Sequence, residues 1–188
     1  MSLERFEIDP GHSTVEFLVR HLAVSKVRGC FQRFHGTLLI DTADLEASSV
    51  EACVITESLD TNEPQRDTHL RSADFFDAAE YPEMCFTSTG VQSSDVGRLT
   101  IRGDLTLHGV TREVVLDGAY NGRVRDPWGA DRVGLEATTI LDRRDYGLVW
   151  NAALDAGGVL VGNAVEVGIK IEAVLRASPE GPGGATTP

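Results

Sequence analysis

Aromatic residues, cysteines and basic residues are all scarce in this chain of 188 residues. Aromatic side chains make up 6 % of it, and 17 Lys and Arg face 29 Asp and Glu, giving a net charge of −12. Because an acidic surface repels phosphate backbones and no basic cluster offsets this, we expect no nucleic-acid partner. No apolar run approaches the roughly 18 residues of a membrane span, so we expect no membrane-embedded segment.

The chain has too few cysteines to suggest a fold held together by disulfides or zinc. Cys30, Cys53 and Cys85 are odd in number, far apart and in no CxxC pair, which argues against both a disulfide scaffold and a zinc ribbon. We expect buried free thiols. The five histidines form no HxH or HExxH motif, so we predict neither a metal site nor a cofactor.

The ends of the chain suggest a cytoplasmic protein of one domain. The start, MSLERFEIDPG, lacks the basic and apolar segments of a secretory signal, which favours a cytoplasmic location. We assign residues 1–176 to a single domain, since β-rich domains of this size are often undivided. The end, SPEGPGGATTP, has nothing to bury, so 177–188 is predicted to be a flexible tail.

Alternating apolar residues predict strands over most of the chain. Val15, Phe17 and Val19 begin an inward-facing row that His21 continues by parity. The run from Val27 to Asp41 contains Gly29 and Gly36, at which we expect the strand to bend. The run from Val159 to Arg176 would be roughly 55 Å long if straight, so it must curl, and curled antiparallel strands close into barrels.

The clearest hairpin runs through RLTIRGDLTLHGVTREVVLDG. With His108 and Gly109 as its loop, Leu107 faces Val110 and one apolar face continues across both strands. Leu105 then faces Arg112, which places a guanidinium on the inner face. Arg112 is either a rim residue that reaches water or a polar anchor for a ligand, and its closeness to the turn favours the rim.

The stretch from Asp60 to Thr87 interrupts the β pattern with helical signals. We predict a helix capped by Asn62, with Pro64 in its first turn, and a second short turn capped by Asp74. Leu70, Phe75 and Phe76 would then point inward and close one side or end of the barrel. A further helical turn is predicted in DRRDYG, from Asp142 to Gly147.

About eight strands result, in an all-β fold with short helices that forms a closed antiparallel barrel. Such a barrel can fill itself with side chains or enclose one small ligand, and alternation alone does not distinguish the two. Catalysis is not expected: Ser13 follows His12 near Asp9, but adjacent strand residues project to opposite faces.

Four blocks of the sequence, in order, resemble the YceI-like family of lipocalin-like barrels that bind polyisoprenoids and other long amphiphiles. They are FEIDPGHSTVEFLVRHLAVSKVRGCF, RDTHLRSADFFDAAEYPEMCF, LTIRGDLTLHGVT, and LDRRDYGLVWN with GGVLVGNAVEVGIKIEA. The resemblance covers roughly residues 6 to 176. It implies a long lumen for an apolar chain and no catalytic constellation. Together with long exposed strand edges, it makes a homodimer plausible.

On this basis we expect non-catalytic binding, transport or storage of an isoprenoid or fatty-acid-like lipid. The alternatives are an enzyme acting on such a molecule and a structural barrel with a packed core. The low aromatic content favours a cavity, because medium-sized aliphatic rows fill a barrel poorly. Charged residues at the mouth, among them Arg66, Asp67 and Arg143, would suit a polar head group. The predicted ligand-binding residues are Phe17, Val19, His21, Leu70, Phe75, Phe76, Phe86, Leu99, Ile101, Arg112, Leu135, Trp150, Val165 and Val167.

Overall fold

The computed structural model describes residues 3–22, 24–94, 97–153 and 158–176. The predicted tail, 177–188, lies outside the described residues. Within them, strands dominate and one short α-helix occurs. No helix in these ranges is long and apolar enough to cross a membrane.

The strands in chain order are β1 (Glu4–Ile8), β2 (Thr14–His21), β3 (Ser25–Phe31), β4 (Phe34–Ile40), β5 (Ser49–Ile55), β6 (Leu59–Asp60), β7 (Glu83–Ser93), β8 (Arg98–Leu107), β9 (Val110–Arg125), β10 (Asp131–Asp142) and β11 (Val161–Leu175). The helix is α1 (Pro64–Arg71), and single 3₁₀ turns are η1 (Pro10–His12), η2 (Leu45–Ala47), η3 (Thr56–Ser58) and η4 (Arg143–Tyr146).

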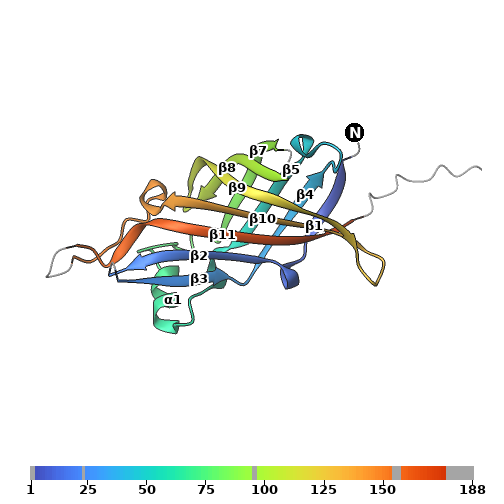
Figure 1. Ribbon diagram of the computed structural model, residues 1–188. Helices are drawn as coiled ribbons and strands as arrows, with labels where there is room; N and C mark the ends of the chain where they lie inside the picture. Colours follow the sequence, from blue (N-terminus) through green and yellow to red (C-terminus); the bar gives the residue numbers. More distant parts are fainter. Residues whose placement is uncertain (1–2, 23, 95–96, 154–157, 177–188) are drawn as a thin grey trace, which may run out of the picture.

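The sheet closes on itself as an antiparallel barrel of eight strands, in the order β1-β4-β5-β7-β8-β9-β10-β11, with β11 pairing back to β1 (Figure 1). The predicted barrel is therefore confirmed. β11 supports two strands along one edge, because β1 pairs with its C-terminal end and β2 with the rest. From β2 the sheet continues through β3 to β6. In Figure 1, α1 lies on the side of β2 and β3.

The hairpin of β8 and β9 has the register that alternation predicts. Leu107 pairs with Val110, and Leu105 pairs with Arg112. His108 adopts a positive φ of 52° and Gly109 one of 72°, the left-handed backbone that a two-residue hairpin loop needs. The η4 turn is also as predicted, with Asp142 as its N-cap and Gly147 in the left-handed conformation at its end.

The bend expected at Gly29 and Gly36 falls instead between them, where β3 ends at Phe31 and β4 begins at Phe34. The glycines serve close packing. A Cβ on Gly29 would lie 2.3 Å from the ring of Phe17, its partner across the strands. Gly29 thus leaves room for an aromatic ring to lie across the sheet.

The lumen is packed with side chains at one end. One fully buried cluster there consists of Phe6, Leu38, Ile40, Val133 and Ala173. A second cluster beside it consists of Val91, Leu99, Ile101, Val114, Leu116 and Ala137. This end of the barrel is a conventional hydrophobic core, which leaves the opposite end for any cavity.

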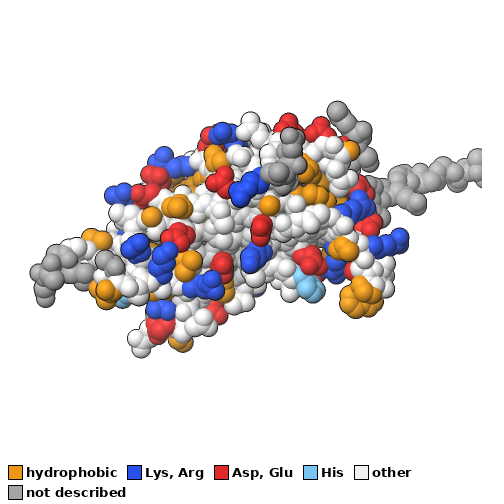
Figure 2. Space-filling model, in the orientation of Figure 1, with side chains coloured by type: hydrophobic (Ala, Val, Ile, Leu, Met, Phe, Trp, Pro, Cys, Tyr) orange, Lys and Arg blue, Asp and Glu red, His pale blue; other side chains and the backbone are white. Residues whose placement is uncertain are grey.

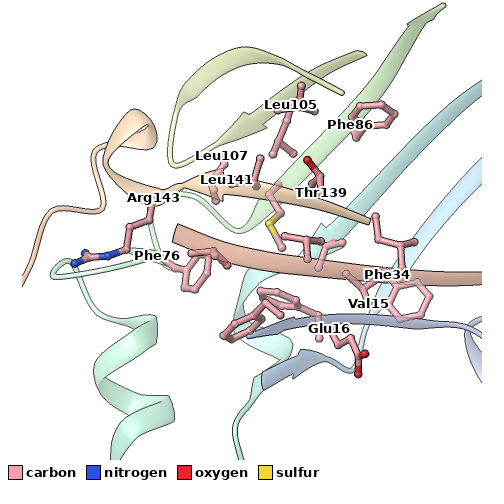
Figure 3. Close-up of a pocket in the computed structure, with 18 of the residues that line it drawn as sticks. Val15, Glu16, Phe34, Phe76, Phe86, Leu105, Leu107, Thr139, Leu141 and Arg143 are labelled. Atoms are coloured by element: carbon pink, nitrogen blue, oxygen red, sulfur yellow. The ribbon is translucent and has the colours of Figure 1, made fainter. Parts of the chain in front are cut away.

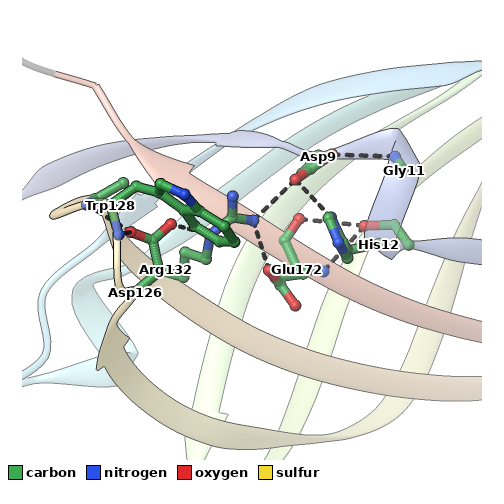
Figure 4. Close-up of polar contacts among 9 residues, drawn as sticks. Asp9, Gly11, His12, Asp126, Trp128, Arg132 and Glu172 are labelled. Carbon is green, nitrogen blue, oxygen red and sulfur yellow. Dashed lines mark hydrogen bonds and ion pairs between the residues drawn. The ribbon is translucent and has the colours of Figure 1, made fainter.

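A polar network ties β1 and η1 to β10 and β11 on the outside of the barrel (Figure 4). Arg132 donates to Asp9 at 2.8 Å, to Asp126 at 2.8 Å and to Glu172 at 2.5 Å. His12 also bonds Asp9, at 2.9 Å. These hydrogen bonds, first that from Arg132 and then that from His12, lower the pKa of Asp9 to about 2.

The hairpin next to this network exposes Trp128. Its side chain is 86 % exposed, so Trp128 belongs to neither the core nor the lumen. The backbone N–H of Trp128 donates to the carboxylate of Asp126, which fixes a tight turn that holds the indole away from the barrel. Elsewhere, acidic and basic side chains intermingle over the visible face (Figure 2).

Cys53 and Cys85 form a disulfide, so the expectation of three free thiols is wrong for this pair. They face each other across β5 and β7 with their Cα atoms 4.1 Å apart. Sequence distance conceals such a pair, because they are 32 residues apart and only the strand register brings them together. Cys30 remains a free thiol.

We expect Asp9→Asn to reduce the dependence of stability on acid pH. The folded-state pKa of about 2 lies below the ordinary value of about 3.9, so the Asp9 contribution is complete above about pH 5, shrinks as the pH falls, and is lost only below about pH 2. The variant should lose on the order of 1 kcal/mol at pH 6 and only about a third of that at pH 2.5, measured by urea unfolding. Asp104→Asn, on the exposed part of β8, controls for the loss of one charge. An equal loss for Asp9→Asn at both pH values would contradict the network.

Reducing the disulfide should destabilise the barrel without unfolding it. Loop closure over 32 residues predicts a loss of about 3–4 kcal/mol in the free energy of unfolding. Guanidinium unfolding of the Cys53→Ser/Cys85→Ser variant measures it, and Cys30→Ser is the matched control. A double variant as stable as the parent would show that the disulfide contributes nothing.

Candidate functional site

The half of the lumen away from the packed clusters holds a cavity of about 380 Å³. Strands from all sides of the barrel contribute to it, and α1 with the following turn borders one end. Figure 3 shows Leu105, Leu107, Leu141 and Thr139 directed into the space between the strands, while the Glu16 carboxylate points away. Glu16 instead lies 3.6 Å from Arg28 on the outer face. The cavity surface is therefore almost wholly apolar.

Most of the residues predicted from sequence lie on the cavity wall: Phe17, Val19, His21, Leu70, Phe75, Phe76, Phe86, Ile101, Leu135, Trp150, Val165 and Val167. They come from β2, the segment around α1, β7, β8, β10, the segment after η4, and β11. Period-two alternation is thus sufficient to find the inner face of each strand. Their role in binding stays a prediction.

Leu99 and Arg112 do not lie on the wall of this cavity. Leu99 faces inward but sits in the packed half, 5 % exposed among Val91 and Leu116. Arg112 is exposed, and its Nε donates to the backbone carbonyl of Asp145 at 2.7 Å. The register at Arg112 is as expected, but its long side chain leaves the inner face and reaches η4, as the rim interpretation anticipated.

The helix that borders the cavity begins differently from the prediction. Glu63, not Asn62, is the N-cap, and its carboxylate accepts from the N–H groups of Gln65 and Arg66 at 3.1 and 2.5 Å. Asn62 has a positive φ of 60°, and Pro64 occupies the first turn as expected. A glutamate cap satisfies the same free N–H groups as a shorter side chain.

An aromatic cluster covers the cavity where α1 ends. The His69 ring contacts Phe75 and Trp150 edge-on, at centroid distances of 5.1 and 4.7 Å. Asp74 does not cap a turn but hydrogen-bonds His69 Nε2 at 2.8 Å, which orients the imidazole. Phe76 meets Phe31 edge-on at 5.8 Å. The Asp60 to Thr87 stretch thus closes this end of the barrel with rings.

Arg66 brings a cation to the cavity wall. Its Nε donates to Thr61 Oγ1 at 2.7 Å and its Nη2 to the Thr61 carbonyl at 2.8 Å. Asp67, 7 % exposed, accepts from the N–H and hydroxyl of the same threonine. Among the described residues no group accepts from Nη1 of Arg66, so part of the guanidinium fork stays available.

Arg143 is a structural clamp rather than an open anchor. It is 6 % exposed, and burial lowers its pKa. Its guanidinium donates to the carbonyls of Gly162, Leu148 and Trp150 at 2.9, 2.6 and 2.9 Å, with longer contacts from Nη2 to β11. All five N–H groups are then engaged, which fixes the segment after η4 against β11.

Sequence reasoning missed several wall residues, although the same alternation marks those that lie on strands. They include Phe31, Phe34, Leu38, Leu105, Leu107, Leu141, Leu148 and Leu160, with His69 from α1. The inference from scarce aromatics also needs correction. Six of the seven phenylalanines line the cavity, so rings are concentrated on this wall rather than absent from it.

Ser13 and His12, which are adjacent in sequence, form hydrogen bonds with different partners and not with each other. Ser13 Oγ donates to the Glu172 carbonyl at 3.2 Å and accepts from its N–H at 3.0 Å. His12 is bound to Asp9 on the outside, whereas His21 lies on the cavity wall. Asp9, His12 and Glu172 lie close enough to hold a metal ion, but Arg132 already binds both carboxylates.

An eight-stranded antiparallel barrel with an apolar cavity and a helical segment at one end is lipocalin-like in architecture. The YceI-like domain model matches residues 6–173, and the chain therefore belongs to the YceI-like family. A UPF0312 protein of Vibrio cholerae is 44 % identical over 137 residues, 73 % of this chain and 72 % of that protein.

Two solved structures share the fold. The Campylobacter jejuni YCEI protein has a TM-score of 0.72 and 26 % identity, over 84 % of this chain and 90 % of that one. A polyisoprenoid binding domain from Saccharophagus degradans has a TM-score of 0.67 and 17 % identity, over 93 % of this chain and 100 % of that one. The family and the closed barrel thus agree with the resemblance found in the sequence.

Phe75→Ala should cost about 3–5 kcal/mol in the free energy of unfolding, because the ring is 5 % exposed and packs on His69 and Trp150. Phe76→Ala should cost less, since Phe76 is half-buried. Chemical denaturation measures both. Trp128→Ala removes an exposed ring and should change stability by no more than about 0.5 kcal/mol. If Phe75→Ala were as stable as Trp128→Ala, the closing segment would not depend on this ring.

Proposed function

We propose that this protein binds a single long-chain lipid, of isoprenoid or fatty-acid-like chemistry, in the cavity of its barrel without transforming it. The observation that carries the proposal is an apolar cavity of about 380 Å³ in a barrel whose other half is filled with side chains apart from a space of about 20 Å³. An empty apolar space of that size forfeits packing contacts, so an apolar occupant supplies what the side chains do not.

The energetics favour a chain without a demanding polar pattern. Burying about 10 methylenes yields a gross ~8 kcal/mol, which exceeds the lower estimates of the cost of immobilising a ligand. A wall of aliphatic residues and phenylalanine rings offers apolar contacts to a branched isoprenoid and to a straight acyl chain alike. The Saccharophagus degradans domain, described as polyisoprenoid binding, supports the first of these.

The polar end of the lipid would lie near α1. Arg66 keeps donors that no described group uses, and His69 stands one turn further along the same helix. Arg143, by contrast, has its donors engaged by carbonyls. A head group that accepts hydrogen bonds therefore fits the Arg66 side of the wall.

The polar side chains on the cavity wall favour a binding role over an enzymatic one, because other groups of the protein already hold them by hydrogen bonds. His69 is held by Asp74, and Arg143 is held by backbone carbonyls. Such contacts orient side chains and close the cavity. They do not pair a nucleophile with a base in the way that covalent catalysis requires. A purely structural barrel is disfavoured by the cavity itself.

Val165→Asp should abolish lipid uptake. It adds an unpaired carboxylate to the apolar wall, and burying such a charge is strongly unfavourable. Uptake of a fluorescent polyprenyl or fatty-acid probe should fall by more than about tenfold in protein that retains its circular dichroism spectrum. Ile101→Asp tests the opposite wall in the same way.

Val115→Asp is the matched control, since it adds the same charge at an outward position of β9 opposite Arg102. It should take up the probe like the parent. A folded Val165→Asp variant that binds the probe as well as Val115→Asp would rule out the lumen as the binding site.

A further inference from the structure

Across the outside of the barrel, strand register brings together residues that lie far apart in sequence. Cys53 on β5 pairs with Cys85 on β7, and His35 on β4 pairs with Cys53 from the other side. Glu83 is two residues before Cys85 and so projects from the same face of β7. One carboxylate and two sulfurs thus meet on one patch of the sheet.

This patch belongs to the outer surface, although Cys53 also borders the cavity wall. The neighbours Val54 and Met84 line the cavity, and alternation turns the cysteines the other way. Glu83 is exposed, and the two cysteines are half-buried. The patch is therefore open to solutes while the lumen is occupied, and a ligand bound on it does not depend on the proposed lipid binding.

The distances within the patch suit one cation. The ligand atoms of Cys53, Cys85 and Glu83 all lie within 4.8 Å of one another. Bonds of about 2.3 Å from Zn²⁺ to thiolate sulfur at a tetrahedral angle place two sulfurs about 3.8 Å apart. Directly opposed cysteines can reach that separation by rotating about their Cα–Cβ bonds once they are no longer bonded to each other.

We propose that reduction of the Cys53–Cys85 disulfide creates a binding site for a thiophilic divalent cation such as Zn²⁺, formed by both thiolates and the Glu83 carboxylate. The fourth position of a tetrahedral site is open to water or to His35. Two sulfurs with one oxygen are a donor set that zinc accepts and that Mg²⁺ and Ca²⁺ do not prefer. The sequence-based expectation of a metal-free protein then applies to the disulfide form.

A dithiol reductant can open the Cys53–Cys85 disulfide. The reductant supplies two electrons and two protons, becomes a disulfide itself, and leaves two thiols on the protein. The cation then displaces both thiol protons to solvent and binds the two thiolates. Oxidation by a disulfide oxidant reverses the sequence and expels the cation, because the sulfurs bond to each other again.

The experiment titrates Zn²⁺ against a chromophoric chelator, using full-length protein without a metal-binding tag, in its disulfide form and after reduction by a phosphine. We expect one zinc per chain for the reduced protein and none at this site for the disulfide form. Glu83→Gln should weaken binding by at least about tenfold, the loss seen even for outer-shell partners of metals. Cys53→Ser/Cys85→Ser should lose it.

Two controls separate this patch from other donors. Cys30→Ser should bind zinc like the parent, since burial raises the pKa of the Cys30 thiol and it lies on β3. His12→Gln tests the cluster beside Arg132 and should likewise leave zinc binding unchanged. Reduced parent whose thiols have been alkylated repeats the double variant in the native sequence, in case that variant folds poorly.

Cobalt gives an independent readout. Co²⁺ should produce a sulfur-to-metal charge-transfer absorption in reduced parent and in Cys30→Ser, and none in alkylated protein. The proposal is overturned if reduced parent binds no zinc, or if the disulfide form or the Cys53→Ser/Cys85→Ser variant binds it as tightly. Loss of zinc binding in Cys30→Ser or His12→Gln would also overturn it.

Discussion

The pairing of β11 is the constraint on which the rest of the barrel depends. One edge of this strand runs along β10, and the other holds β1 at one end and β2 along the remainder. With β11 in place the barrel has no free edge at its closure, whereas without it β1, β2 and β10 would each present an unpaired edge. Arg132 and its three carboxylates reinforce the place where β1 gives way to η1 and β2.

The pairing of β11 with both β1 and β2 also determines which part of the lumen holds the cavity. Where β1 and β4 form part of the barrel wall, the interior is filled by side chains. They are Phe6, Leu38, Ile40, Val133 and Ala173. Where β2, β3 and the α1 segment form the wall, rings lie against the sheet or over the end of the barrel, and a cavity remains. Gly29 contributes by letting the Phe17 ring lie across its neighbour instead of projecting into the space.

Local patterns predict the strands, the β8–β9 register and most of the cavity wall, because alternation and turn chemistry are read from neighbouring residues. They do not predict which half of the lumen is packed, so the assignment of Leu99 to the cavity wall fails. Arg112 shows that the correct register does not fix where a long side chain ends. The Cys53–Cys85 pair depends on a contact across 32 residues, which spacing alone conceals.

The central claim is that the cavity is a lipid site, and the most direct measurement is native mass spectrometry of purified full-length protein, with organic-solvent extraction of the same sample. The account predicts a bound species at one copy per chain whose extracted mass is that of an isoprenoid or fatty-acid-like molecule, and which is absent from folded Val165→Asp protein. A parent protein that carries no such molecule, and does not take one up from lipid vesicles, would contradict it.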